Sequence, residues 1–419
     1  MKNIEIMAPV GSFEALSAAI QAGAGSVYFG VGKLNMRSKS SQNFTLDDLA
    51  SIATACNERG IKSYVTINTV IYDEELAAMR QLVDACKQHG ISAVIASDHA
   101  VIQYAVSKSV EVHMSTQCNI TNIEAVRYYS RYADVMVTAR ELNLDQVKQI
   151  TKAIEKEQIK GPGGELVRIE IFVHGALCMA VSGKCYLSLD LMNSSANRGA
   201  CLQPCRRAYN VKDREQELEM DIENEYIMSP KDLNTIGFLD RILDAGVQVL
   251  KIEGRGRSPE YVKVATRVYG EAVKAVQDGT FGPEKVQVWN DSLASVYNRG
   301  FWDGYYLGRK LGEWTEAYGS RATRRKVYVG KINNYFAKLA VAEIKMETQH
   351  IKLDDDILII GPTTGVHEDR ISEIRVDLIS VPQSQKGENC SIPVSQAVRR
   401  GDKVYKLVDN QTDSGDLEQ

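Results

Sequence analysis

The chain has 419 residues, of which 44% are hydrophobic and 25% are charged, a composition typical of a globular protein with a sizeable core. Its formal net charge of −4 argues against a protein that coats nucleic acid with its whole surface, although local basic patches stay open. No run approaches the ~18 apolar residues of a membrane helix, and the N-terminus reads as a strand rather than a signal peptide. We therefore expect a cytoplasmic protein with no membrane partner.

Short apolar runs alternate with amphipathic segments over the first two thirds of the chain. Eight strand-like runs are separated mostly by helical segments, which predicts βαβ units and a parallel sheet. Eight such units favour a closed TIM-like barrel, and no strand precedes the Gly-x-Gly-x-x-Gly pattern of a dinucleotide fold. The predicted strands are 4–10, 25–30, 62–68, 93–96, 110–115, 135–139, 167–173 and 247–253, and the predicted helices are 13–22, 46–59, 74–89, 99–106, 122–132, 144–156, 235–244 and 259–278.

The pattern of apolar and turn residues in the sequence changes after residue 325. Short strand-like runs separated by turn residues then follow one another, which predicts a small all-β barrel. The expected fold class is therefore α/β: a TIM-barrel-like parallel barrel with a cysteine-rich insertion, followed by a small all-β domain. The expected parts are a catalytic barrel over 1–310 with a cysteine-rich segment at 176–207, a linker at 311–325, a β domain over 326–410 and a flexible tail at 411–419.

Half of the eight cysteines occur within one short stretch, in the pattern Cys-x6-Cys-x15-Cys-x3-Cys. Four thiolates brought together are a ligand set for zinc or for an iron–sulfur cluster. Structural disulfides are rare in the cytosol. Zinc stays possible, although only the last pair has the spacing of a zinc knuckle, and an iron–sulfur cluster is favoured. The four cysteines are Cys178, Cys185, Cys201 and Cys205.

Chemistry in a TIM barrel takes place at the carboxyl ends of the strands. Several polar residues fall at the predicted strand ends, where they face either a ligand or one another in a ring of salt bridges that closes the barrel. These residues are Asn68, Asp98, Ser115, Thr116, Gln117, Arg140, Glu141, Glu170, His174, Lys251, Glu253 and Arg255.

Several blocks of the sequence resemble the signature of the collagenase-like peptidase family (peptidase U-family 32). The resemblance covers roughly residues 4–310. The cysteine-rich blocks are EIFVHGALC at 170–178, GKCYLS at 183–188 and NRGACLQPCR at 197–206, and the others are MAPVGS at 7–12, STQ at 115–117, AREL at 139–142, SPKDL at 229–233 and KIEGR at 251–255. Cys118 departs from the small residue usual after STQ; the pattern favours an apolar substitute, and a role as a redox group or fifth thiol stays open.

The resemblance implies an activity other than proteolysis. Chemically understood members of the family are oxygen-independent hydroxylases that carry a 4Fe–4S cluster on four cysteines. One branch converts the wobble uridine of tRNA to 5-hydroxyuridine, with prephenate implicated as the hydroxyl source. Another modifies a cytidine of ribosomal RNA, and a third hydroxylates ubiquinone precursors. The length and single β domain of this chain resemble the tRNA branch, so tRNA, a small-molecule hydroxyl donor and an electron donor are the expected partners.

The resemblance carries the cluster ligands onto the four cysteines of the short stretch. Proton transfer and binding of the hydroxyl donor are expected of Glu170, His174, Lys251, Glu253 and Arg255, and contacts to RNA phosphates of Arg198, Arg206, Arg324 and Arg325. Hydroxylation of another RNA or of a quinone precursor stays open, and so do two functions of other classes. A peptidase would cleave protein whether or not a cluster is bound, although no cysteine or serine has a visible His and acid partner at a motif spacing. An accessory protein with a structural metal would bind RNA without modifying it.

Overall fold

The computed structural model describes residues 3–39, 42–209, 228–308, 313–315 and 319–410. Its larger part is a closed barrel of parallel strands, which confirms the TIM-like prediction. Closure is made by β9, which pairs in parallel with β1 on one side and β7 on the other. The barrel strands are β1 (Glu5–Pro9), β2 (Ser26–Gly30), β3 (Lys62–Ile67), β4 (Ala93–Ala96), β5 (Glu111–Met114), β6 (Val135–Val137), β7 (Arg168–Ala176) and β9 (Val249–Ile252).

Helices surround the barrel and are capped by side chains that the sequence places at their starts. Ser12, Asp98, Asn122 and Asn143 each accept a hydrogen bond from a backbone N–H of the helix that follows, which satisfies a donor with no partner inside the helix. None of the helices in the described ranges is long and apolar enough to cross a bilayer. The helices are α1 (Phe13–Gln21), α2 (Asp48–Asn57), α3 (Leu76–Gln88), α4 (His99–Ser107), α5 (Ile123–Tyr129), α6 (Leu144–Glu157), α8 (Leu239–Asp244), α9 (Pro259–Gln277) and α10 (Pro283–Ala294).

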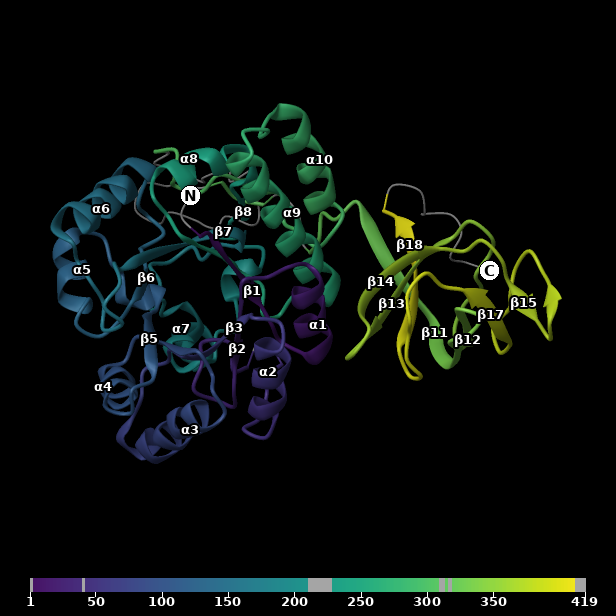
Figure 1. The fold of residues 1–419 in the computed structure, drawn as a ribbon, viewed down its shortest axis with the longest axis horizontal. Helices are drawn as coiled ribbons and strands as arrows, with labels where there is room; N and C mark the ends of the chain where they lie inside the picture. Colours follow the sequence, from purple (N-terminus) through teal and green to yellow (C-terminus); the bar gives the residue numbers. More distant parts are fainter. Residues whose placement is uncertain (1–2, 40–41, 210–227, 309–312, 316–318, 411–419) are drawn as a thin grey trace.

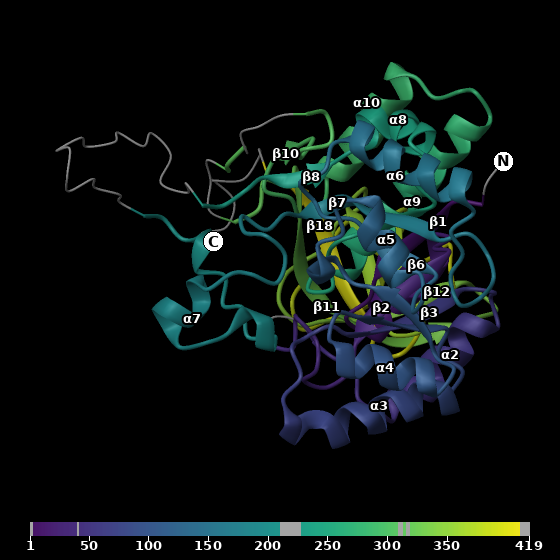
Figure 2. The same cartoon turned by 90° about the vertical axis from the view of Figure 1, so that its left-hand side faces the viewer.

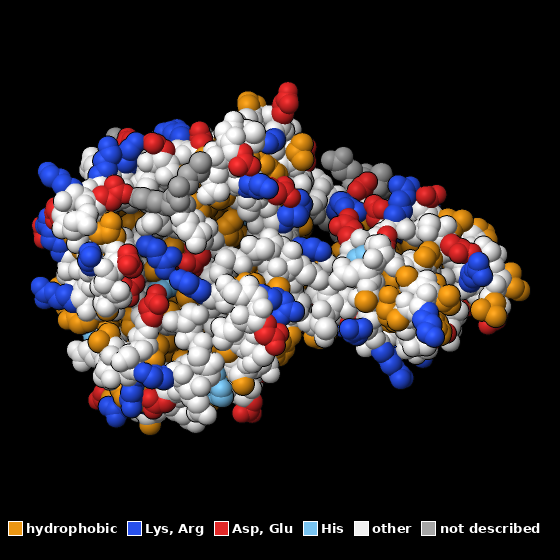
Figure 3. Space-filling model, viewed as in Figure 1, with side chains coloured by type: hydrophobic (Ala, Val, Ile, Leu, Met, Phe, Trp, Pro, Cys, Tyr) orange, Lys and Arg blue, Asp and Glu red, His pale blue; other side chains and the backbone are white. Residues whose placement is uncertain are grey.

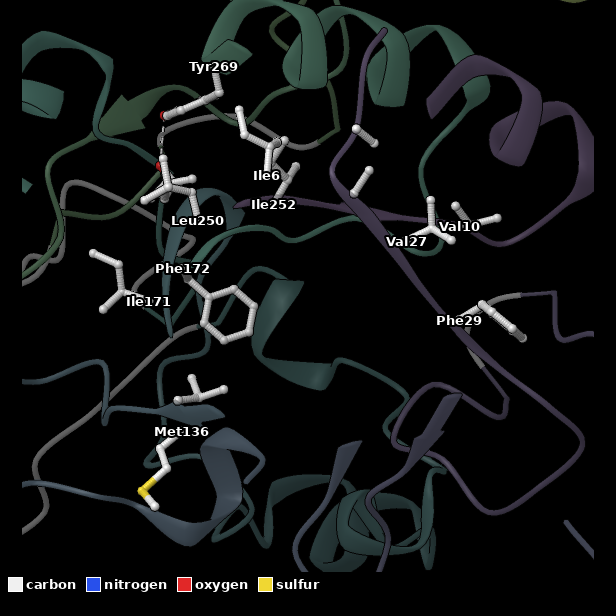
Figure 4. Close-up of a cluster of buried hydrophobic side chains, with 14 of the residues drawn as sticks. Ile6, Val10, Val27, Phe29, Met136, Ile171, Phe172, Leu250, Ile252 and Tyr269 are labelled. Carbon is white, nitrogen blue, oxygen red and sulfur yellow. Dashed lines mark hydrogen bonds between the residues drawn. The ribbon is translucent and has the colours of Figure 1, made fainter. Parts of the chain in front are cut away.

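The barrel buries two apolar layers because side chains alternate between the faces of each strand. The outward layer packs under the helices, and Figure 4 shows Ile6, Ile171 and Leu250 of three adjoining strands gathered near Tyr269 of α9. The inward layer is small and includes Met7, Tyr28, Tyr64, Ala93, Ile95, Val135 and Val249.

A buried polar cluster closes the amino end of the barrel. Glu5 accepts hydrogen bonds from the Tyr64 hydroxyl at 2.7 Å and from Arg168 at 2.8 Å. The described cavity lies at the opposite end of the barrel, at the carboxyl ends of the strands.

The strand β7 extends past the barrel and carries the cysteine-rich segment. Its last residues pair antiparallel with β8 (Asp232–Asn234), which also pairs with β10 (Phe301–Trp302). The cysteine-rich segment with α7 (Leu187–Met192) is inserted between β7 and β8, and Figure 2 shows α7 standing out from the barrel. The insertion therefore starts directly from the mouth of the barrel.

The C-terminal part is an antiparallel all-β domain, as predicted. Its sheet has the order β14-β13-β18-β11-β12-β17-β15-β16. The predicted tail at 411–419 and part of the predicted linker lie outside the described residues. The strands are β11 (Arg324–Phe336), β12 (Val341–Met346), β13 (Asp356–Gly361), β14 (Gly365–Arg370), β15 (Arg375–Val376), β16 (Ile379–Ser380), β17 (Asn389–Pro393) and β18 (Lys403–Asp409).

The hairpin of β13 and β14 packs on α1 and α9 of the barrel (Figure 1). The Gln21 amide donates to the Thr364 carbonyl at 2.7 Å and accepts from the Val366 N–H at 3.2 Å. Ala18 of the same helix packs against Val366 and neighbouring aliphatic side chains. The docking face lies on the outside of the barrel, away from the cysteine-rich segment.

Gly11 gives a prediction for barrel stability. A Cβ at this position would lie 2.2 Å from the Arg255 backbone oxygen, so we expect Gly11→Ala to lower the free energy of unfolding by about 1–3 kcal/mol. Denaturant titration followed by tryptophan fluorescence measures this, because all three tryptophans precede residue 315. Gly282→Ala is the control, since its Cβ would meet nothing within 4 Å. Equal stability of the two variants would contradict the close approach.

Candidate functional site

A single cavity of about 570 Å³ combines the barrel mouth with the cysteine-rich segment. Its floor is formed by side chains from the carboxyl ends of the strands, among them Tyr28, Thr66, Phe172 and Lys251. Its outer wall is the segment that leaves β7. The volume lies within the range of small-molecule sites, so the cavity can hold a nucleobase or a small acid.

All four cysteines of the segment line this cavity, and all eight cysteines of the chain are free thiols. Burial raises the pKa of the Cys205 thiol to about 11, the Arg206 charge opposes the rise, and Cys178, Cys201 and Cys185 add to it. This mutual influence shows that the four thiols are near neighbours. In the described part of the chain, no three His, Cys, Asp or Glu side chains are arranged to hold a metal ion. The donor set of four thiols fits, by its chemistry, a thiolate-bound cluster.

Arg198 clamps the cysteine-rich segment to the loop after β3. Its guanidinium donates two hydrogen bonds of 2.5 Å to the Glu75 carboxylate and lies 3.9 Å from the centre of the Tyr72 ring. It also donates to the Val70 carbonyl, and the Val70 N–H donates to Asn197 O. The hydrogen-bond donors of Arg198, a predicted phosphate contact, are thus bound to groups of the protein itself.

The other predicted phosphate contacts also have partners within the protein or lie far along the chain. Arg206 lines the cavity but donates to Ser229 Oγ and to the Pro230 and Leu177 carbonyls. Arg324 forms ion pairs of 3.0 Å with Asp356 and Glu368 in the β domain. Arg325 is half-buried on the same strand. The structure does not bring the four predicted contacts, Arg198, Arg206, Arg324 and Arg325, into one patch.

An ion pair lies inside the barrel at the cavity floor. Lys251 Nζ donates to Glu170 Oε1 at 2.7 Å, and both side chains are buried. Lys251 Nζ also lies 4.6 Å from the centre of the Tyr28 ring and 5.5 Å from that of Phe172. Lys251 lines the cavity, whereas Glu170 lies behind it with Oε2 lacking a hydrogen-bond partner. A charged pair this deep is costly to desolvate, which makes it a candidate for chemistry.

Glu253 and Arg255 also line the cavity, at the end of β9. Burial raises the pKa of Glu253, but the charges of Arg37, Arg257 and Arg140 together outweigh burial and hold it below its usual value. Arg37 bonds to this carboxylate at 2.8 Å. Arg255 donates to Thr66 Oγ1 at 2.8 Å, and burial lowers its pKa to about 10. Glu253 is therefore a carboxylate, and Arg255 a cation, at neutral pH.

The structure does not bring His174 to the cavity. Its ring is buried against Tyr261, Tyr269 and Phe301, with ring centres 5.6–5.8 Å apart. Burial, with the nearby Arg257 charge, lowers the pKa of His174 to about 3. The imidazole is therefore neutral at physiological pH and serves as a packing group in this arrangement.

Several cationic residues of the site escaped the sequence reasoning because they come from loops outside the strand ends. Arg257 donates to Asp232 at 2.9 Å, and Arg299 lies near the same carboxylate. The only local signal was that Arg257 follows the KIEGR block by two positions. Cys118, by contrast, packs against the core beside Tyr129 and does not line the cavity in the described structure.

The charge of the lining is strongly unbalanced. Glu253 is its single carboxylate among the described residues, and no histidine lines it. On the face drawn in Figure 3, acidic and basic side chains are interspersed rather than segregated. Positive charge is thus concentrated in the cavity, whose cationic residues are Arg37, Arg140, Arg206, Lys251, Arg255, Arg257 and Arg299.

Comparison with known proteins places these residues in a family. Residues 11–316 match Peptidase family U32. A "Collagenase" of Porphyromonas gingivalis (strain ATCC BAA-308 / W83) is 58% identical over 97% of this chain and 98% of that protein. "tRNA hydroxylation protein P1" of Bacillus subtilis (strain 168) is 28% identical over 86% of this chain and 84% of its own length.

A third relative is named for the modification of a different RNA. "23S rRNA 5-hydroxycytidine C2501 synthase" of Escherichia coli (strain K12) is 35% identical over 65% of this chain and 40% of its own length. The family match and the full-length likeness to the collagenase-named relative agree, and the chain belongs to Peptidase family U32.

Proposed function

We propose that the chain is an iron–sulfur-dependent tRNA hydroxylase that forms 5-hydroxyuridine at the wobble position. In this proposal Cys178, Cys185, Cys201 and Cys205 hold a 4Fe–4S cluster, and prephenate is the source of the hydroxyl group. The observation that carries the proposal is that four thiols and a set of buried cations line the same cavity. The relatives named for tRNA and rRNA hydroxylation support the substrate class.

The cavity suits a base taken out of its stack, as an enzyme that modifies a base requires. When bound, the cluster supplies electrons at the cavity wall. Met179 of the cysteine-rich segment is exposed and lines the cavity, so it can pack on a nucleobase and keep water from it. We assign the binding of the hydroxyl donor to the cationic floor.

We assign proton transfer to Lys251. Its Nζ reaches the cavity and is held by Glu170 from behind. An ammonium fixed in this way can give a proton to an oxygen of the bound donor, and Glu170 orients the Nζ for this step. Such positioned acid–base groups contribute about 10²–10⁴-fold to a rate. His174 has no part in this assignment, because its ring is enclosed and neutral.

Peptidase activity is the second candidate, favoured by the name of the 58%-identical relative. A serine or cysteine peptidase at this cavity would need a nucleophile with a base, often histidine, and an aspartic peptidase would need two carboxylates. Within the described lining there is no histidine and a single carboxylate, which is bound to Arg37. The chemistry of the lining therefore favours the hydroxylase.

Removal of one cysteine tests the proposed cluster. Anaerobically purified wild-type protein is expected to hold about four irons and matching sulfide, with broad visible absorption. Cys201→Ser should lose most of the iron and fail to restore 5-hydroxyuridine to tRNA in cells that lack the enzyme. Cys118→Ser is the matched control, because this thiol lies outside the cavity, and it should keep both properties.

The same proteins distinguish the two candidate functions. A gelatin or peptide cleavage that survives in Cys201→Ser would establish the peptidase and sink the hydroxylase. A colourless wild-type protein that holds one zinc ion would contradict the proposed cluster and would show that the four cysteines form a structural metal site.

Variants of the ion pair test the proton-transfer assignment. Lys251→Met should lower hydroxylation by at least about 100-fold with iron content unchanged. It should also cost about 3–5 kcal/mol of stability, because the buried Glu170 loses its counter-charge. The double variant Lys251→Met/Glu170→Gln should recover stability but not hydroxylation. Recovery of both, measured by thermal unfolding and nucleoside analysis, would show that the pair is only structural.

A further inference from the structure

Titratable side chains continue inside the barrel behind the ion pair of the cavity floor. His113 of β5 is fully buried, and its Nε2 lies 3.0 Å from Glu111 Oε1. The Glu111 side chain is 36% exposed, at the start of β5. Among the described residues, the buried polar atoms without a hydrogen-bond partner include His113 Nδ1 and Glu170 Oε2. The function proposed above gives His113 and Glu111 no role.

The registers of the strands show which side chains share a layer of the barrel. In a barrel of eight strands with a shear of eight, residues of equal height advance by one position from each strand to the next. Tyr64 is paired through Ala93 with Glu111. The layer that contains Tyr64 should therefore contain His113, two positions further along β5. The two ring centres lie 4.4 Å apart, which confirms the rule for this barrel.

The same rule makes His113 and Glu170 neighbours in that layer. His113 is paired through Val135 with Arg168, and Glu170 stands two positions further along β7. Both side chains face the barrel interior, because one stacks on Tyr64 and the other bonds to Lys251. His113 Nδ1 and Glu170 Oε2 thus belong to neighbouring side chains, which a direct hydrogen bond or one bridging water can join.

Glu111 fixes the hydrogen on one ring nitrogen of His113. Burial raises the pKa of the Glu111 carboxyl, but the hydrogen bond and charge of His113 and the charges of Lys62 and Arg168 hold that pKa below its usual value. A carboxylate only accepts hydrogen bonds, so Nε2 carries a hydrogen. Glu170 is the ion-pair partner of Lys251, so a hydrogen on Nδ1 would find a second carboxylate as its acceptor.

We propose that His113 is an imidazole protonated on both nitrogens, which joins Glu111 to Glu170 and stores a proton for Lys251. This inference rests on the proposed function, in which Lys251 gives a proton to an oxygen of the bound donor. While tRNA covers the mouth of the barrel, bulk water is kept from the cavity. A replacement proton then has to come from the protein, and His113 is the group behind Lys251 that can supply it.

The transfer is balanced, because one proton moves and no electron does. After Lys251 has lost its proton, Glu170 takes a proton from Nδ1 of His113 and passes it to Nζ. His113 is then neutral, with its remaining hydrogen on Nε2 toward Glu111. When the RNA leaves, Lys251 passes a proton back through Glu170 to Nδ1 and takes another from water at the open mouth.

Histidine-ring nitrogen NMR on the full-length protein tests the inference without an assay of activity. The signals of His113 are identified by their loss in His113→Gln. We expect both ring nitrogens of His113 to carry hydrogens at neutral pH, and Glu170→Gln/Lys251→Met to shift Nδ1 far more than Nε2. A neutral His113 ring, or an Nδ1 signal that the double variant leaves in place, would overturn the inference.

The rate of 5-hydroxyuridine formation gives a second test. His113→Gln still donates to Glu111 but stores no proton, so it should slow the reaction by about tenfold or more and raise the solvent deuterium isotope effect. His367→Gln is the matched control, because this buried histidine also lies 3.1 Å from a carboxylate, that of Asp369, but in the β domain. It should change neither quantity. A slower His113→Gln with the wild-type isotope effect would show a merely structural role and overturn the proton store.

Glu111→Gln keeps the test open if His113→Gln does not fold, because it changes a partly exposed side chain. Loss of this carboxylate should leave His113 neutral and raise the isotope effect in the same way, and an unchanged ring and isotope effect would count against the store. Wild-type protein that hydroxylates tRNA with a neutral His113 would overturn the store alone. Wild-type protein with a doubly protonated His113 that never modifies tRNA would overturn the proposed function and leave the link from Glu111 to Glu170 in place.

Discussion

Closure of the barrel by β9 is the constraint on which the site depends. This strand is hydrogen-bonded to β1 and β7 at once, which fixes its register against both. Lys251 is therefore paired with Phe172 of β7, and its Nζ reaches the Glu170 carboxylate two residues earlier on that strand. Glu253 and Arg255 follow at the rim. A shift of β9 by one residue would turn these side chains toward the helices. The ion pairs of Lys251 with Glu170 and of Glu253 with Arg37 would then be broken.

The second constraint is the way the cysteine-rich segment is attached. It leaves the barrel on an extended β7, returns through β8, and is held in the middle by Arg198 and at its end by Arg206. Both arginines donate their hydrogen bonds to groups of the protein and so hold the segment against the barrel. The segment can thus present four thiols to the cavity while its outer face stays exposed. The cationic floor and the thiol wall are separate pieces of chain brought together by this attachment.

Most of the fold followed from local patterns in the sequence. Alternating apolar runs and amphipathic segments predicted the barrel units, and the change of sequence pattern after residue 325 predicted the all-β domain. The clustering of the cysteines located the wall of the cavity. Charged residues were harder to assign, because a strand-end position does not reveal which way a side chain faces. Glu253 reaches the cavity, whereas His174, in an equally suggestive block, is enclosed by aromatic rings. Arg37 and Arg299 come from loops and had no periodicity to reveal them.

The order of the strands along the chain has a consequence for biosynthesis. The strand that closes the barrel lies after the cysteine-rich segment in the sequence, so a ribosome releases all four thiols before β9 exists to join β1 and β7. Until then both strands present unpaired edges, and the polypeptide is an open sheet prone to association. Chaperone binding to the nascent chain would be most valuable in this interval, because it would shield the two unpaired edges until β9 has been synthesised.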